Sequence, residues 1–241
     1  MPRGQPDYGQ YQVETYGAGL ADMAELAARL DSIVVHDRRG RVVLLDNFEA
    51  TLIKWNVGKW GAASAVLDST YPRSGSQDVR LRVLTAADFE VWMIKGIHML
   101  PSPRIGSEVS ICRASTNTYF EILIECYDGV TYWQAGVRLD FNGNALSYYN
   151  TAGGWTPFAT TPPFVDAAHV LTPVKLVVDF STGRYVRFIL GYTEYDLTAY
   201  IMDFVGSGLA PYIRSELKLV RRAGVDSSIY LDDYILTQEE P

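Results

Sequence analysis

Short segments in which apolar and polar residues alternate follow one another along most of this chain, with turn residues between them. Residues 79–83 alternate Val, Leu and Val with two arginines, and Asn142-Gly143 separates the segments 132–141 and 145–149. An apolar residue at every second position is the pattern of a half-buried β-strand, and Asn-Gly is a strong signal for a hairpin turn. The sequence therefore predicts a mainly β protein with antiparallel strands.

Strand-like segments occupy most of the chain beyond residue 32. They include 33–36, 41–45, 89–97, 109–114, 119–127, 175–180, 184–190, 216–220 and 229–236. We expect sequence neighbours to form hairpins, among them 33–36 with 41–45 and 109–114 with 119–127. A chain of this length can form one all-β domain, so residues 32–241 are predicted to be a single antiparallel β-sandwich, a jelly roll. Residues 101–104 and 150–173 are expected to be long loops.

The first 31 residues follow a different pattern. Residues 1–18 contain Pro, Gly, Gln and Tyr without periodicity, which predicts an extended N-terminal arm. Residues 19–31 predict one short amphipathic α-helix, because apolar residues recur at helical spacing and Glu25 precedes Arg29 by four positions. The apolar face of this helix packs either on its own domain or on a partner chain, and both alternatives are open. The candidate assembly residues are Tyr8, Tyr11, Leu20, Met23, Ala27 and Leu30.

The chain is acidic, with a formal net charge of −7 and a pI near 5.0. Binding to DNA or RNA needs clustered Lys and Arg, and the short basic runs at 38–41 and 221–222 are too small to provide them, so nucleic acid is excluded as a partner. No stretch approaches the roughly 20 apolar residues of a membrane span. Residues 1–16 also lack the apolar segment of a secretory signal peptide, so we expect a protein made in the cytoplasm.

Cys112 and Cys126 are the only two cysteines. In a hairpin that turns near residues 115–117, Cys126 would lie about 17 Å along the strand from the residue opposite Cys112. That separation is too large for a disulfide. The sequence therefore predicts two free, buried thiols.

Two segments carry a resemblance to a known group of proteins. Leu45-Asp46-Asn47-Phe48-Glu49, followed by Trp55, resembles the opening strand of jelly-roll carbohydrate-binding modules, and Ile229-Tyr230-Leu231-Asp232-Asp233-Tyr234-Ile235 resembles their closing strand. Residues 137–149 and 175–190 look like hairpins of concanavalin A-like and laminin G-like sandwiches. The chain is also broadly similar to a small jelly-roll structural or decoration protein of a phage. The resemblance implies the fold more directly than the function.

The resemblance to carbohydrate-binding modules also implies a structural calcium ion, held by Glu49 and Asp233. Strand alternation gives this hypothesis some independent support, because Asp233 would share a face with Leu231 and Ile235. A carboxylate among apolar neighbours requires a cation or hydrogen-bond donors, and carboxylate and carbonyl oxygens are the ligands that calcium takes. Arginine or backbone amides could satisfy Asp233 instead, so the metal is one of two alternatives.

Enzyme chemistry is not indicated by the motifs of the chain. His36, His98 and His169 are scattered without metal-ligand spacing. Glu121 and Glu125 share a strand face, but four residues of strand separate them by about 13 Å. Glycosidases hold their two carboxyl groups about 5 Å or about 6.5–9.5 Å apart. A partner on another strand is conceivable, but the sequence does not identify one, and the prediction is that the chain is not an enzyme.

Aromatic residues are the best binding candidates. We expect Trp92 and Trp133 to lie in the core and Trp155, in a Gly-Gly-Trp-Thr-Pro loop, to be the exposed tryptophan, while Tyr148 and Tyr149 could present flat ring faces to a sugar or another protein. The main functional prediction is a non-catalytic structural or decorating subunit on the surface of a virion-like particle. This subunit would assemble through the arm, the helix and the sandwich as a homo-oligomer or with other particle subunits. The alternative is a carbohydrate-binding module that recognises a glycan through Trp155, Tyr148 and Tyr149.

Overall fold

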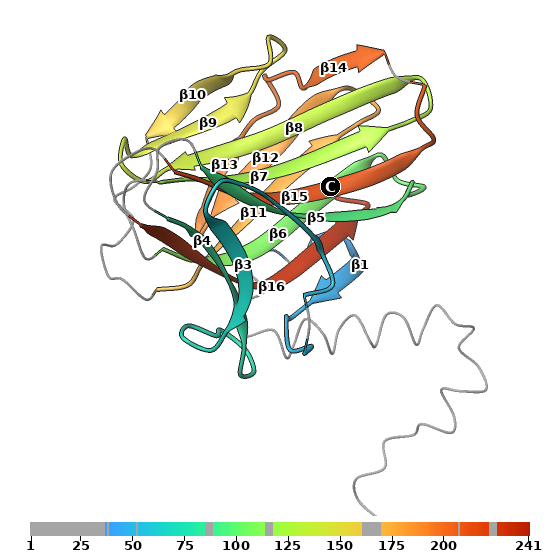
Figure 1. Ribbon diagram of the computed structural model, residues 1–241. Coiled ribbons are helices and arrows are strands. Elements are labelled where there is room, and N and C mark those ends of the chain that lie inside the picture. Colours follow the sequence, from blue (N-terminus) through green and yellow to red (C-terminus); the bar gives the residue numbers. More distant parts are fainter. Residues whose placement is uncertain are drawn as a thin grey trace, which may run out of the picture.

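Two antiparallel sheets of eight strands each make up the described part of the chain in the computed structural model (Figure 1). The structure describes residues 37, 39–51, 53–84, 89–113, 118–160, 170–206, 208–221 and 226–241. The predicted arm (1–18), the predicted helix (19–31) and all six candidate assembly residues lie outside these ranges, as does the segment 33–36. None of the described residues forms a helix long and apolar enough to cross a membrane.

Sheet A has the strand order β13-β12-β11-β6-β16-β4-β3, and β1 pairs with β16 beside this path. Its strands are β1 (Arg41–Asp46), β3 (Ala63–Asp68), β4 (Asp78–Val83), β6 (Arg104–Arg113), β11 (Thr172–Asp179), β12 (Arg184–Leu190), β13 (Thr193–Asp196) and β16 (Ser227–Gln238). The opening and closing strands named above are therefore partners, since Leu45 of β1 lies opposite Ile235 of β16.

Sheet B has the strand order β10-β9-β8-β7-β15-β5-β2, and β14 pairs with β8 beside this path. Its strands are β2 (Asn56–Trp60), β5 (Glu90–His98), β7 (Thr118–Tyr127), β8 (Thr131–Asp140), β9 (Ala145–Tyr149), β10 (Trp155–Thr160), β14 (Asp203–Gly206) and β15 (Tyr212–Arg221). Figure 1 shows β8, β7 and β15 running side by side across the molecule. The mainly β, two-sheet sandwich is thus confirmed.

The hydrophobic core lies between the sheets and follows the predicted alternation. On β4, Val79, Leu81 and Val83 are fully buried in the core, while Arg80 and Arg82 are only half-buried. On β7, the even-numbered residues from Phe120 to Cys126 belong to the core cluster. Burying one such large apolar side chain stabilises the fold by roughly 1.5–3 kcal/mol. Because side chains alternate, the odd-numbered residues of β7 lie on the outer face of sheet B.

Two predicted hairpins are present and one is not. The turn at Asn142-Gly143 joins β8 to β9, and the turn before Arg184 joins β11 to β12. The predicted hairpin of 109–114 with 119–127 is wrong, because β6 belongs to sheet A and β7 to sheet B. Both cysteines are nevertheless buried thiols outside any disulfide, as predicted. Their separation follows from their positions in different sheets.

The predicted loop 150–173 contains a strand. Residues Trp155–Thr160 form β10, which pairs with β9 at the edge of sheet B. Pro157 interrupts the register there, and an edge strand tolerates a proline because one side of it forms no ladder hydrogen bonds. Trp155 therefore projects from a strand and not from a loop.

The alternation expected along 229–235 is interrupted by a β-bulge. The register of β16 against β6 shifts between Asp232 and Ile235, and Asp233 has a φ of 48°. A bulge inserts an extra residue, so the side chains beyond it change faces. Leu231 and Tyr234 consequently both belong to the core cluster, whereas Ile235 does not. The premise that Asp233 shares a face with both Leu231 and Ile235 is wrong for this reason.

Candidate functional site

The outer face of sheet B carries charged side chains in the middle of its strands. In the cross-strand register, Glu121 of β7 lies between Arg138 of β8 and Lys218 of β15. Two residues further along β7, Leu123 lies opposite Glu216 of β15. Charges at the centre of a sheet face away from the core require partners or a polar ligand, so this face is the first place to look for a site.

Glu125 occupies the next outward position on β7, and its partners come from both neighbouring strands. Arg214 of β15 and Gln134 of β8 lie opposite it. Its carboxylate lies 2.5 Å from Nε of Arg214 and accepts a hydrogen bond of 3.2 Å from Gln134. The side chain of Glu125 is only 1% exposed. A buried carboxylate held by a guanidinium in this way has a fixed position.

Glu121 is held in the same way. Its carboxylate lies 2.5 Å from Arg138, and its side chain is 4% exposed. Burial raises the pKa of Glu121, and the charges of Arg138 and Lys218 oppose that rise. Two buried glutamates, each with its own arginine, therefore lie on one face of β7.

Glu216 lies between these two glutamates on the adjacent strand. Burial, and then the negative charge of Glu125, raise the pKa of Glu216 to about 7, although Arg214 and Lys218 oppose the rise. Residues placed diagonally across antiparallel strands are about 7–8 Å apart. Glu216 is diagonal to both Glu121 and Glu125, since it pairs with Leu123 between them. It is the cross-strand carboxyl partner that the sequence did not identify.

Trp155 covers part of this face. Arg138 lies between two aromatic rings, 4.3 Å from the ring centre of Trp155 and 4.7 Å from that of Tyr119. The Trp155 ring lies over Gly136 of β8, where an added Cβ would come within 3.2 Å of it. Tyr149 contacts Trp155 edge-on at 5.3 Å. A glycine on β8 thus makes room for the indole ring beside Arg138.

Tyr185 of sheet A fixes this part of sheet B from the core side. Its hydroxyl accepts a hydrogen bond of 2.9 Å from the amide of Gly136 and donates one of 2.8 Å to the carbonyl of Tyr149. These backbone groups lie just beyond the described β8–β9 register, which ends at Val137 and Tyr148. The hydroxyl therefore replaces ladder hydrogen bonds at the point where Trp155 crosses the sheet.

The three residues predicted to bind a ligand are not all on one face. Tyr149 and Trp155 contact each other on the outer face. Tyr148 packs against the core cluster, stacked on Tyr200 at 4.3 Å and edge-on to Tyr185 at 5.8 Å. Ligand binding by these residues stays a prediction, and its geometry now favours Tyr149 and Trp155.

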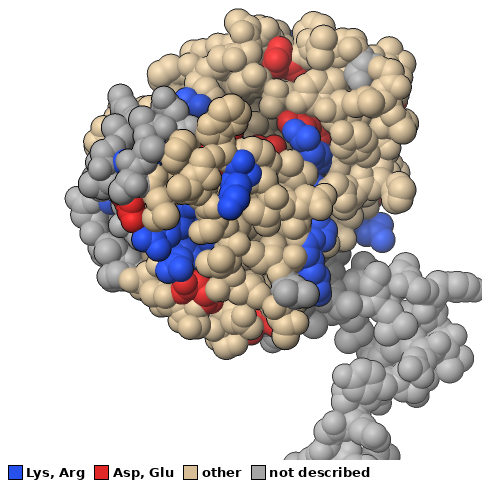
Figure 2. Space-filling view, viewed as in Figure 1, with Lys and Arg blue, Asp and Glu red and all other residues tan. Residues whose placement is uncertain are grey.

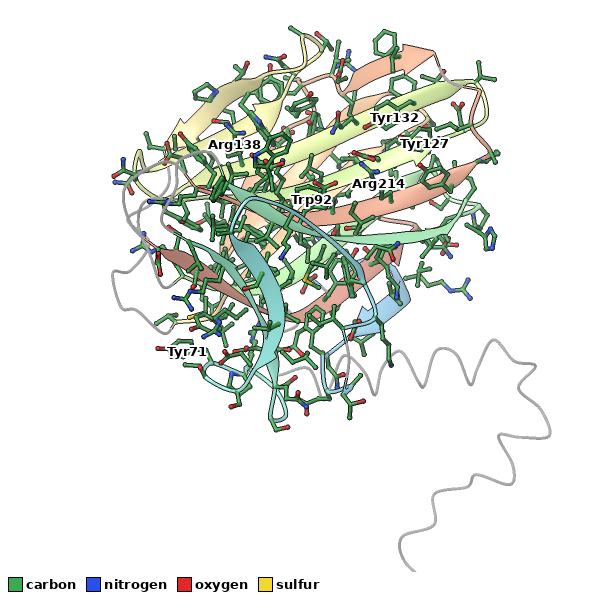
Figure 3. The ribbon with its side chains drawn as sticks, viewed as in Figure 1. Tyr71, Trp92, Tyr127, Tyr132, Arg138 and Arg214 are labelled. Atoms are coloured by element: carbon green, nitrogen blue, oxygen red, sulfur yellow. The ribbon has the colours of Figure 1, made fainter. Side chains whose placement is uncertain are left out.

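Of the two tryptophans expected in the core, only one packs there. Trp133 packs against the core cluster. Trp92 lies on the opposite side of β5 from Val91 and Met93, over Gly58 of β2, with Lys218 at 5.8 Å. The prediction for Trp92 is wrong because alternation shows which residues share a face, but not which face is covered. Figure 3 shows Trp92, Arg138, Arg214, Tyr127 and Tyr132 on the same side of the molecule.

Glu49 and Asp233, the predicted calcium ligands, both bind the segment 73–77. The Glu49 carboxylate accepts hydrogen bonds from the amides of Ser76 and Gln77 at 2.7 and 2.8 Å, which lower its pKa. Asp233 accepts a hydrogen bond of 2.6 Å from the hydroxyl of Ser74 and lies 4.0 Å from Arg73. In the described ranges no group of three or more His, Cys, Asp or Glu has the arrangement of a metal site. The calcium ion stays a prediction, and the contacts of the Asp233 carboxylate among the described residues are a serine hydroxyl and a distant arginine, not the backbone amides of the alternative.

No protein-family model and no curated protein matches this chain. Among solved structures with a similar fold, an endo-β-1,4-glucuronan lyase from the fungus Trichoderma reesei has a TM-score of 0.57 at 10% identity, with coverage of 82% of this chain and 95% of the lyase. A lectin from Bauhinia forficata in complex with GalNAc has a TM-score of 0.50 at 11% identity, covering 82% and 98%. A sialidase has a TM-score of 0.52 at 8% identity over 83% of this chain, which spans only 19% of the sialidase.

These likenesses establish the fold: a jelly-roll sandwich of the concanavalin A-like kind, found in both glycan-active enzymes and lectins. The prediction that the chain is not an enzyme is therefore wrong, because an enzyme, the lyase, has this fold over 95% of its length. The prediction rested on the distance between Glu121 and Glu125 along one strand, β7. Glu216 lies on the neighbouring strand β15 and did not enter that comparison. The resemblance to a phage protein is not supported, and the comparisons favour glycan binding over a virion subunit.

Proposed function

We propose that the chain binds a glycan on the outer face of sheet B. The observation that carries this proposal is the arrangement of Arg138 between Trp155 and Tyr119, beside the buried carboxylate of Glu121. A sugar ring has an apolar face that packs on an aromatic ring and hydroxyl groups that need fixed donors and acceptors. Ligand sites combine aromatic walls with a few precisely held polar groups in this manner.

The balance of charge on this face supports a ligand without a strong charge of its own. Arg138 and Arg214 are each paired with a glutamate, and Lys218 is paired with Glu90 at 2.7 Å. Figure 2 shows basic and acidic side chains scattered over a largely uncharged surface, with no patch of one sign. Paired charges attract a phosphate or sulfate weakly, but they still offer hydrogen bonds to hydroxyls. The lectin and the lyase of the same fold, whose names refer to GalNAc and to glucuronan, add support.

Replacing Trp155 with alanine should weaken glycan binding by roughly tenfold or more, because one aromatic contact contributes about 0.5–1.5 kcal/mol beyond its buried area. A glycan array with the wild-type chain identifies the ligand, and titration calorimetry then measures both affinities. Tyr192→Ala is the matched control, since Tyr192 is 94% exposed and lies between β12 and β13 of sheet A. Equal affinity of Trp155→Ala and wild type, with both folded by circular dichroism, would show that the face does not bind the glycan.

A second candidate function is hydrolysis of the bound glycan, and Glu216 is the observation that favours it. A carboxyl group with a pKa of about 7 is protonated in part at neutral pH and can donate a proton to a glycosidic oxygen. Glu125 lies diagonal to Glu216, and their separation of about 7–8 Å leaves room for a water between the two carboxyl groups, so Glu125 is the carboxylate that can activate this water. The leaving oxygen takes the proton of Glu216 as the glycosidic C–O bond breaks, the oxygen of water bonds to the anomeric carbon, and Glu125 takes the proton that this water loses. Release of reducing ends from soluble polysaccharides tests this candidate.

A further inference from the structure

The outer face of sheet B contains a hollow near the end of β5. It has a volume of about 310 Å³ and is lined by Gly96, Ile97, His98 and Tyr212. Gly96 and His98 are exposed, and they share the outer side of β5 with Trp92, while Tyr212 and Arg214 of β15 lie opposite them. The hollow is therefore on the same face as Trp155 and the three glutamates.

Tyr212, which lines this hollow, is the last ring in a stack of three tyrosines. Tyr132, Tyr127 and Tyr212 are direct cross-strand neighbours on β8, β7 and β15. Tyr127 stacks on Tyr132 at 4.5 Å and on Tyr212 at 4.4 Å, with interplanar angles of 28° and 19°. Figure 3 shows Tyr127 and Tyr132 together, with Arg214 nearby. This stack covers both faces of Tyr127 and one face of Tyr212, and on its other side Tyr212 has His98 of β5 as its cross-strand neighbour.

The hollow is open because two side chains that could fill it do not. Gly96 has no side chain, and a Cβ added there would meet nothing within 4 Å. Arg214, its cross-strand neighbour, turns toward Glu125 of β7, 2.5 Å away, and also lies 3.5 Å from Glu216 of its own strand. A glycine inside a strand weakens the strand and often marks a place where a ligand comes close to the backbone.

We infer that the hollow over Gly96 is a second sugar subsite, in which a neutral hexose or N-acetylhexosamine ring packs over Gly96 and against Tyr212. The imidazole of His98 supplies a hydrogen bond to a ring hydroxyl, and Ile97 contributes apolar contact. In the register of β15 with β7, Arg214 pairs with Glu125 and Tyr212 pairs with Tyr127. The sugar ring would therefore lie two residues further along the strands than Glu125, at the next position that faces outward. This inference rests on the proposed function, and it gives the glycan contacts on both sides of the glutamates.

Filling the hollow tests the subsite. Gly96→Val places a side chain where nothing lies within 4 Å, and valine favours strands, so the variant should fold at least as well as wild type. Gly206→Val is the matched control, because Gly206 of β14 is also a strand glycine with open space around it. Saturation-transfer NMR with glucose, galactose, mannose, N-acetylglucosamine and N-acetylgalactosamine detects binding of single rings. We expect a signal in wild type and in Gly206→Val that is lost in Gly96→Val.

Affinity for the glycan identified on the array should also fall, by roughly tenfold, in Gly96→Val alone. Undiminished monosaccharide signals and unchanged glycan affinity in Gly96→Val would overturn the subsite. If Trp155→Ala still abolished binding in that case, the proposed function would stand without it. A wild type that binds no glycan on the array and none of the five sugars would overturn both. Should Gly96→Val not fold, Tyr212→Leu takes its place, and unchanged affinity there overturns the inference.

Discussion

Replacement of Lys175 with methionine should lower the free energy of unfolding by about 3–5 kcal/mol, because removing one partner of a buried ion pair leaves uncompensated charge in the protein. Lys175 of β11 is only 2% exposed at its side chain. Its ammonium lies 2.8 Å from Glu240, 3.1 Å from Asp37 and 3.7 Å from Glu108. All three carboxylates are themselves buried. Equilibrium urea unfolding at pH 7 measures the difference.

Arg187 does not replace the missing charge in this variant. It already binds Asp37 at 3.4 Å, the carboxylate of Glu240, and the carbonyl of Pro241 at 2.7 Å. Arg187 and the partly exposed Arg39, which binds Asp37 at 2.6 Å, would then remain beside three buried carboxylates. Lys218→Met is the control, because Lys218 is partly exposed and its ion pair within the described ranges is with the partly exposed Glu90, so its loss should cost less than about 1 kcal/mol. Equal losses in the two variants would contradict the role given to Lys175.

The loss caused by Lys175→Met should shrink in acid. Burial alone would raise the pKa of Asp37, but hydrogen bonds from Arg39 and the charge of Lys175 bring it down to about 2. A carboxyl whose pKa is lower in the folded state stabilises the protein above its unfolded pKa, and this contribution is lost as pH falls toward about 2. The wild type therefore loses more stability between pH 4 and pH 2 than the variant. Repeating the urea titrations across that range measures the convergence.

This network also fixes the segments that precede and follow the sandwich in the sequence. Asp37 lies before β1, and Glu240 lies after β16, yet both reach Lys175 in the middle of sheet A. The ion pairs therefore hold both flanking segments on the outer face of sheet A. The candidate site is on the outer face of sheet B, so variants in the network should alter stability without touching the site.

Local signals in the sequence were sufficient for elements whose partners are close along the chain. The Asn142-Gly143 turn sets the β8–β9 hairpin, and the alternation of residues 79–83 gives the core side of β4 correctly. The predicted hairpin of β6 with β7 was wrong, because a short connection between two apolar strands has the same sequence pattern whether both strands lie in one sheet or in different sheets. The β10 strand was missed because its proline and the preceding glycines resemble a loop, and only an edge position accommodates them.

The candidate site depends on strand pairings between segments far apart in the sequence, which no local sequence pattern reveals. The sequence shows Glu121 and Glu125 as a pair on one strand. Their arginines and Glu216 come from β8 and β15, and β15 is far along the chain. Regular alternation identifies the outward residues of each strand separately. Which strands become neighbours, and in which register, is decided by the packing of the whole sandwich. A charged residue at an outward position within an otherwise apolar strand was the one signal that could have pointed to Arg138 and Arg214.

If the chain hydrolyses its glycan, Glu216→Gln should lower kcat/KM by roughly 10²–10⁴-fold, because it removes the proton donor. The wild-type rate should fall as pH rises through about 7, where Glu216 loses its proton, and the variant should lack this limb of the profile. Reducing-end release from soluble polysaccharides measures both. Glu194→Gln, on β13 of sheet A, is the control and should keep the wild-type rate and pH profile.

Stability distinguishes a lost proton donor from a damaged fold. The folded-state pKa of Glu216 is raised from 4.5 to about 7, so between these values the folded protein holds a proton that the unfolded chain does not. Stability then falls as pH rises across this window, and it falls less once the carboxyl is replaced by an amide. Glu216→Gln should therefore be more stable than wild type at pH 8 and similar to it at pH 4. If the variant is inactive but shows this stability profile, the lost rate is due to the missing carboxyl group. If the rate is unchanged and the glycan still binds, the face is a binding site, and its glutamates serve only to hold the arginines in place.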